Sequence, residues 1–248
     1  MGRILAIVIL YFPDKEVEKI LSTFEKEVDS VMVIDNTQDN IGIAEALNLA
    51  LKRATDEGYE WLLTMDQDSV FEVGALNELK SFAFSCNDNI AIVSPFHFIK
   101  KPLSSTAAEE VQVTMTSGNL LRVSAAKSVG PFDEKLFIDS VDNEYCLRLR
   151  KNGFKIIRVN RSVLNHQLGT LQNYGLFSTV THPASRRYYI TRNMLYVMRK
   201  YFPQFFLFGS KELIKSFFLI LLVEDDKINK LKAMVRGHAD FLAGRYDK

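Results

Sequence analysis

The stretch Trp61-Leu62-Leu63-Thr64-Met65-Asp66-Gln67-Asp68-Ser69 decides the fold. A short apolar run that ends abruptly in polar residues is typical of a buried strand, and the two carboxylates then fall on the loop that follows it. Two acidic side chains separated by one residue suit a hard cation such as Mg²⁺, which prefers oxygen ligands. The alternative is a turn in which an Asp caps the next helix.

Similar apolar runs occur on both sides of this stretch, and segments with helical spacing separate them. The expected strands are Ile4–Leu10, Val31–Ile34, Ile90–Ser94 and Lys155–Val159, and the expected helices are Lys15–Lys26, Ile41–Glu57 and Val73–Phe84. This alternation predicts a parallel sheet covered by helices. Ligands of such sheets bind beyond the carboxyl ends of the strands, so the loops at Asp35 and Asp66 should share one edge.

The second half of the chain is less regular. It contains two expected strands, Val111–Met115 and Leu120–Val123, and two expected helices, Asp142–Asn152 and Pro183–Tyr201. No linker separates these segments from the first half. We therefore expect one catalytic domain over residues 1–200, with a C-terminal helical extension over residues 201–248 in the same structural unit.

Composition excludes several classes of protein. Of the 248 residues, 47% are hydrophobic and 25% charged, which is typical of a globular protein and excludes extensive disorder. A net charge of +1 provides no general attraction for nucleic acid. Two cysteines cannot build a disulfide framework, and the apolar runs are too short to cross a membrane. A cytoplasmic protein is expected.

Two further polar segments are candidates for chemistry. Asp35 and Asn36 could bind the polar edge of a pyrimidine or a ribose hydroxyl, or could form an ordinary Asx turn. The segment 137–144 contains Asp139, Asp142 and Glu144. A carboxylate there could accept a proton from a substrate hydroxyl as a general base, or could cap a helix.

The expected helix at 183–201 is dense in Arg and Tyr. Arg187 and Arg192 could bind phosphate through their guanidinium groups, or their stems could pack on the rings of Tyr188 and Tyr189. Lone histidines such as His166 are more often structural than ligands. The chain has neither a glycine-rich phosphate loop nor a nucleophile elbow, which argues against kinases, dehydrogenases and common hydrolases.

Together the segments resemble glycosyltransferase family 2. The resemblance is carried, in order, by Ile34-Asp35-Asn36-Thr37, Asp66-Gln67-Asp68-Ser69, Thr116-Ser117-Gly118-Asn119, Asp142-Asn143-Glu144-Tyr145-Cys146 and Arg186-Arg187-Tyr188-Tyr189-Ile190-Thr191-Arg192-Asn193. Within the family these strings look most like bacterial rhamnosyltransferases. The resemblance implies a GT-A type α/β fold, a Rossmann-like, mostly parallel mixed sheet flanked by helices.

The resemblance also implies an activity. It is the inverting, metal-dependent transfer of L-rhamnose from dTDP-L-rhamnose to a hydroxyl of a glycan or lipid-linked acceptor, in cell-surface polysaccharide synthesis. Two alternatives stay open: transfer of another sugar, from UDP-galactose or UDP-GlcNAc, and a catalytically silent protein that binds nucleotide sugars.

Residue roles follow from the matching motifs. The implied general base is Asp142, and the implied ligands of Mg²⁺ or Mn²⁺ are Asp68, Asp66 and His166. The implied nucleotide-sugar contacts are Tyr11, Asp35, Asn36, Asn40, Asp66, Gly118, Arg187 and Arg192.

The segment 201–223 mixes phenylalanines with Lys211 and Lys215. Such a mixture suits an amphipathic segment at the inner face of the cell membrane, near a lipid-linked acceptor. The alternative is a helix packed on the core or on a second subunit, as in a homodimer.

Overall fold

The computed structural model describes residues 2–13, 17–98, 106–166, 171–174 and 177–246, with side chains outside positions 166–180. It divides into two compact units. The first comprises residues 1–134 and 145–167, and the second comprises residues 135–144 and 168–248. The helix at 184–200, which the sequence analysis assigned to the catalytic domain, belongs to the second unit.

A mixed sheet forms the centre of the first unit. Its order is β2-β1-β3-β7-β5-β8-β4, with β6 paired to β8. β1 pairs in parallel with both β2 and β3, and β5 pairs in parallel with β8, whereas β7, β4 and β6 are antiparallel to their neighbours. The strands are β1 (Ile4–Leu10), β2 (Ser30–Asp35), β3 (Trp61–Asp66), β4 (Ser69–Phe71), β5 (Ile90–Phe98), β6 (Ala108–Glu110), β7 (Asn119–Arg122) and β8 (Lys155–His166).

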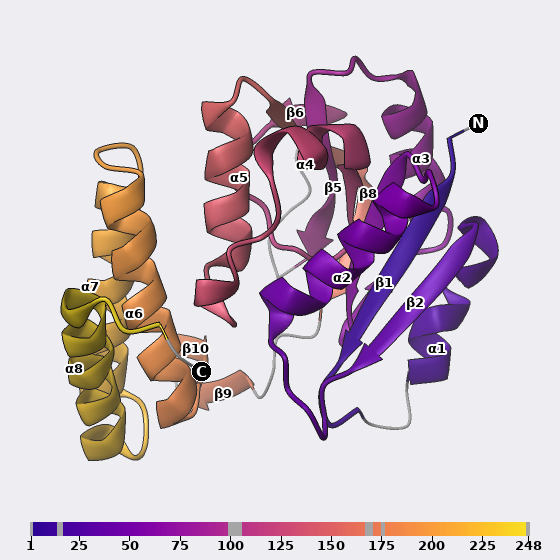
Figure 1. Ribbon diagram of the computed structural model, residues 1–248. Helices are drawn as coiled ribbons and strands as arrows, with labels where there is room; N and C mark the ends of the chain where they lie inside the picture. The colour runs from indigo at the N-terminus through magenta and orange to yellow at the C-terminus, as the bar shows by residue number, and fades with distance from the viewer. Residues whose placement is uncertain (1, 14–16, 99–105, 167–170, 175–176, 247–248) are drawn as a thin grey trace. The chain divides into compact units, whose positions relative to one another are not determined.

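Helices cover both faces of this sheet (Figure 1). Every residue of β1 is buried. Alternate residues of the strand, such as Ala6 and Val8, pack in one core with residues of α1 and α3, and α2 packs on β1 and β3. The helices are α1 (Val17–Ser22), α2 (Ile43–Asp56), α3 (Ala75–Ser85), α4 (Val123–Val129) and α5 (Val141–Lys151), with 3-10 turns at Glu25–Glu27 and Glu134–Leu136. The predicted sheet flanked by helices is confirmed.

Some details differ from the expectations. The helix expected at Lys15–Lys26 is reduced to α1 and a 3-10 turn, and the strand expected at Val111–Met115 is wrong, because strand β6 ends at Glu110. Helix α2 begins at Ile43, after Gly42, rather than at the expected Ile41.

Three helices and a hairpin form most of the second unit. They are β9 (Leu171–Tyr174), β10 (Phe177–Val180), α6 (Ala184–Lys200), α7 (Phe206–Leu222) and α8 (Lys227–Ala243). Each helix packs on the other two. A Cβ atom on Gly237 would lie 2.6 Å from the Tyr188 carbonyl oxygen, so glycine permits the close approach of α8 to α6.

Candidate active site

Three parallel strands of the first unit end side by side. The register pairs Leu10 of β1 with Asp35 of β2, and Ile9 of β1 with Asp66 of β3. Tyr11, the next residue after β1, therefore lies at the same edge as the two carboxylates. The sheet topology thus brings together residues that are up to 55 positions apart in the sequence.

The loop after β2 is an Asx turn. The Asp35 carboxylate accepts a hydrogen bond from the Thr37 N–H at 2.8 Å, and bonds from Thr37 lower the pKa of Asp35. The Thr37 hydroxyl accepts a bond from the Phe12 N–H at 3.0 Å, which ties this loop to the end of β1. Tyr11 remains 51% exposed, so it is open to a ligand at the sheet edge where Asp35 ends β2.

Two asparagines shape the rest of this loop. Asn36 is only 2% exposed, and its N–H donates to the Leu10 carbonyl at 2.8 Å. The side-chain oxygen of Asn40 accepts a bond from the Gly42 N–H at 3.0 Å. Both residues fix the backbone of the loop between β2 and α2, and this loop begins directly after Asp35.

The turn between β3 and β4 contains the acidic pair. Gln67 at its centre is bonded twice to Tyr11: its Oε1 accepts from the Tyr11 N–H at 2.7 Å, and its Nε2 donates to the Tyr11 carbonyl at 2.9 Å. The Asp66 N–H donates to the Ser117 hydroxyl at 3.0 Å. The sequence analysis did not select Gln67 or Ser117, although both lie inside the quoted motifs.

The donor set of this turn fits a divalent cation. Asp66 and Asp68 are both partly exposed and supply hard carboxylate oxygens. Strand β4 follows immediately, and its Ser69 pairs in register with His166 of β8. The side chain of His166 lies outside the described residues. Among the side chains that are described, no group of three or more His, Cys, Asp or Glu residues comes together.

The loop before β7 folds against the end of β3. The Gly118 N–H donates to the Thr64 carbonyl at 2.6 Å, and Gly118 has a φ of +78°. A Cβ atom there would lie 2.8 Å from both Leu164 and Pro95. A position with this φ and this crowding requires glycine, and it brings a bare stretch of backbone next to the acidic turn.

Asp142 lies in the first turn of α5, and residues 141–144 of that helix belong to the second unit. Burial and, to a lesser extent, the nearby Asp139 carboxylate raise its pKa to about 6. Asp139 is paired with Arg186 at 3.1 Å, and burial raises the pKa of Asp139 against the opposing effect of that guanidinium. Asp142 is therefore a better proton acceptor than an exposed carboxylate, and it is still ionised by about ten to one at pH 7.

The backbone before Asp142 is strained and tightly held. Phe137, Asp139 and Ser140 all have positive φ values, between 54° and 62°. The side-chain amide of the buried Asn193 donates to the carbonyls of Leu136, Ile138 and Asp139 at 2.5, 2.6 and 3.1 Å. Asn193 of α6 thus positions the segment that leads to Asp142, a role that the sequence analysis missed.

The two arginines predicted to contact phosphate are both buried in the second unit. Arg187 bonds to Ser216 at 2.5 Å and pairs with Glu224, which also pairs with Lys230 at 3.0 Å. Arg192 donates to the Lys135 carbonyl at 3.0 Å, and its guanidinium lies over the rings of Tyr188 and Tyr189. These placements favour a structural role for both arginines over phosphate binding. For Arg192 they match the alternative interpretation, in which the arginine packs on tyrosine rings.

The sequence matches a known family over the region that carries these features. The model of glycosyl transferase family 2 matches residues 12–145, which include the Asx turn, the acidic turn, Gly118 and Asp142. The chain belongs to glycosyltransferase family 2. It is 24% identical to the dTDP-rhamnosyl transferase RfbF of Shigella flexneri, and the match covers 98% of this chain and 96% of that relative.

Solved structures share the fold of this family 2 protein. The TarS 1–349 fragment of S. aureus, solved with UDP-GlcNAc, superposes with a TM-score of 0.61 at 14% identity, over 97% of this chain and 80% of TarS. The mannosyltransferase PcManGT of Pyrobaculum calidifontis, solved with GDP-Man and Mn²⁺, gives a TM-score of 0.59 at 15% identity, over 98% and 74% of the two chains. The fold is GT-A, as predicted, and the protein is a glycosyltransferase.

Proposed function

We propose that the protein transfers L-rhamnose from dTDP-L-rhamnose to a hydroxyl group of a glycan or lipid-linked acceptor, with inversion at the anomeric carbon, in the synthesis of a cell-surface polysaccharide. One observation carries the choice of donor: the match to a dTDP-rhamnosyl transferase extends over nearly the full length of both chains. The residues at the sheet edge supply groups suited to such a donor.

The first unit would bind the nucleotide. The exposed ring of Tyr11 offers a face for the pyrimidine, and the Asp35 carboxylate can accept a hydrogen bond from its N–H edge. Asn36 and Asn40 fix the loop that carries Asp35. Asp66 would bind a ribose hydroxyl, and the backbone at Gly118 would let the donor approach closely.

Mg²⁺ or Mn²⁺ would be held by Asp68 and Asp66, with His166 as a third ligand by its register position next to Asp68. When bound, the cation neutralises negative charge on the diphosphate leaving group. Gln67 would keep the carboxylates in place, because its two bonds to the Tyr11 backbone fix the centre of the turn.

Asp142 would act as the general base. Its raised pKa suits removal of a proton from the acceptor hydroxyl as that oxygen attacks the anomeric carbon and the bond from that carbon to the diphosphate breaks. Attack on the face opposite the leaving group inverts the configuration and needs no covalent enzyme intermediate.

Helix α7 would contact the surface of an anionic membrane. Of its 17 residues, only Gly209, Ser216 and Ile220 are buried, and large apolar side chains such as Leu207 (80% exposed) and Phe218 face outward with Lys211 and Lys215. The helices of the described residues are each too short or too polar to cross a bilayer. The protein would thus sit peripherally at the inner face of the cell membrane, where a lipid-linked acceptor is available.

A donor panel tests the proposal. The purified protein would be incubated with dTDP-L-rhamnose, UDP-galactose or UDP-GlcNAc, each with Mn²⁺ or with a chelator, and release of the nucleoside diphosphate would be measured. We expect metal-dependent release of dTDP that is at least tenfold faster than release of UDP. Faster release of UDP would reassign the donor, and binding of all three donors without any release would indicate a catalytically silent protein.

A further inference from the structure

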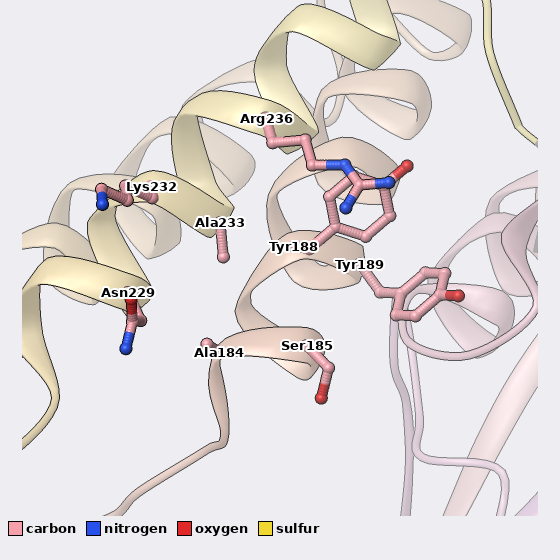
Figure 2. Close-up of a pocket in the computed structure, with 8 residues that line it drawn as sticks. All are labelled: Ala184, Ser185, Tyr188, Tyr189, Asn229, Lys232, Ala233 and Arg236. Atoms are coloured by element: carbon pink, nitrogen blue, oxygen red, sulfur yellow. The ribbon is translucent and has the colours of Figure 1, made fainter.

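The second unit contains a pocket of about 480 Å³ between α6 and α8 (Figure 2). This volume lies within the range of roughly 300–1,000 Å³ that is usual for sites of small ligands. Ala184 of α6 and Ala233 of α8 contribute small side chains to its lining. None of its lining residues is among the proposed donor or metal residues, which lie in the first unit.

Positive charge and aromatic rings line this pocket. Lys232 and Arg236 are four residues apart on α8 and therefore share one face of that helix. Tyr188 and Tyr189 contribute rings from α6, and the Arg236 guanidinium lies 5.2 Å from the centre of the Tyr188 ring. The lining itself contains no Asp or Glu. The Asp240 carboxylate pairs with Arg236 but also with Arg245, so the pocket keeps positive charge that is suited to an anionic ligand.

The surrounding sequence has the same electrostatic character. From Ala184 to Lys248 the chain contains 13 Lys and Arg against 6 Asp and Glu, although the whole chain has a net charge of only +1. The C-terminal segment therefore has a net positive charge, and the rest of the chain has a net negative charge that nearly cancels it. Such a local excess attracts anions to the pocket.

The pocket is connected to the segment that carries the general base. The ring of Tyr189 lies 5.3 Å from the ring of Phe137, and Arg186, on the same turn of α6, is paired with Asp139. Both contacts are made by the strained segment immediately before Asp142. This continuity associates the pocket with the acceptor rather than with the donor nucleotide.

We infer that this pocket binds a sugar phosphate ester, the group through which a lipid-linked acceptor joins its first sugar to the lipid. Lys232 and Arg236 would bind the phosphate through charge-assisted hydrogen bonds. The face of Tyr189 would pack on the sugar ring, and the polar side chains of Ser185 and Asn229 would bond to its hydroxyls. The inference rests on the proposed function for the identity of the acceptor, but it can be tested without turnover.

Calorimetry with α-D-glucose 1-phosphate tests the site, in full-length protein whose donor site is saturated with dTDP and Mn²⁺. We expect binding in the wild type that becomes about 10–100-fold weaker in the double variant Lys232→Gln/Arg236→Gln, because two charge-assisted bonds are lost. The affinity for dTDP itself should stay within twofold. Lys232→Gln alone leaves the Arg236–Asp240 pair in place and should give an intermediate loss.

A charge-matched control removes two exposed lysines of the first unit, as Lys127→Gln/Lys151→Gln. It should change glucose 1-phosphate affinity by less than twofold, and Tyr189→Leu should weaken glucose 1-phosphate more than inorganic phosphate. Absence of binding in the dTDP-saturated wild type, or an equal loss in the control, would overturn the inference and leave the donor proposal standing. Tighter binding of a dodecyl ester of the same sugar phosphate would show that the natural ligand is lipid-linked. Equal binding of the two compounds would show that the natural ligand is a soluble sugar phosphate.

Discussion

Asp142 combines a position at the start of a helix with a pKa of about 6. Asp142→Asn keeps the size of the side chain and removes its ability to accept a proton. We expect the transfer rate to fall by roughly 10²–10⁴ while dTDP affinity stays nearly constant, because the proposed nucleotide contacts lie in the first unit. Steady-state kinetics and calorimetry on the same preparation measure both quantities. Near-normal turnover of Asp142→Asn, with an inactive Asp139→Asn, would show that the base had been misplaced.

The pKa of Asp142 also predicts a pH dependence. A general base works in its ionised form, so kcat/KM should decline as the pH falls through about 6, rather than near the usual value of about 4 for an Asp. The Asp139 carboxylate raises this pKa and the Arg186 guanidinium lowers it. Asp139→Asn should therefore move the acid limb to lower pH, and Arg186→Gln to higher pH. Shifts in the same direction for both variants would contradict this electrostatic account.

Residue types alone could not separate buried arginines from exposed ones. Arg187 and Arg192 lie in a motif rich in phosphate-binding side chains, yet their partners are Glu224, 37 positions later in the sequence, and the Lys135 carbonyl, 57 positions earlier. Only tertiary packing brings these groups together. Asp35 and Asp66 were easier to assign, because their place at the ends of parallel strands follows from the alternation of strands and helices.

Among the elements, the loop before β7 depends on one glycine. Gly118→Ala would place a Cβ atom 2.8 Å from Leu164 and Pro95 at a φ of +78°. We expect a loss of about 2–4 kcal/mol in the free energy of unfolding, from strain and overpacking together. Gly58→Ala is the matched control, because Gly58 has a φ of +71° but no atom within 4 Å of the added Cβ. Denaturant unfolding that gives equal losses for the two variants would show that packing contributes nothing at Gly118.

The long elements could be predicted and the short ones could not. Periodicity predicted β1, β3, α2 and α6 to within a few residues, since each has enough apolar positions to define a pattern. β4 and β6 have three residues each and exist only because they pair with β8, far away in the sequence. The lengths of such strands are set by pairing across the sheet, which a single sequence does not display.

For the whole molecule, the exposed apolar side chains of α7 predict binding to lipid vesicles. The wild type should float with vesicles that contain phosphatidylglycerol and much less with phosphatidylcholine alone, because Lys211 and Lys215 favour an anionic surface. Phe217→Glu/Phe218→Glu should reduce binding at least tenfold, since two rings are lost and two like charges are added near an anionic surface.

The control for this flotation experiment changes two apolar side chains of α8 that are even more exposed than Phe217 and Phe218, as Val235→Glu/Leu242→Glu. These changes should have a smaller effect on vesicle binding. A wild type that does not float but elutes as a dimer, which the Phe217→Glu/Phe218→Glu variant converts to a monomer, would assign α7 to a contact between two copies of the chain.

The two hydrogen bonds between the Gln67 side chain and the Tyr11 backbone have a consequence for the rate of hydrogen exchange. Hydrogen exchange at a mid-strand amide such as that of Ile7 requires the sheet to separate, whereas exchange at Tyr11 requires only that one side chain rotate away. The Tyr11 amide is therefore a spectroscopic reporter of the acidic turn. Nucleotide binding that immobilises the turn should slow deuterium uptake at Tyr11 and leave the rate at Ile7 unchanged, which makes occupancy of the donor site visible in the absence of any acceptor.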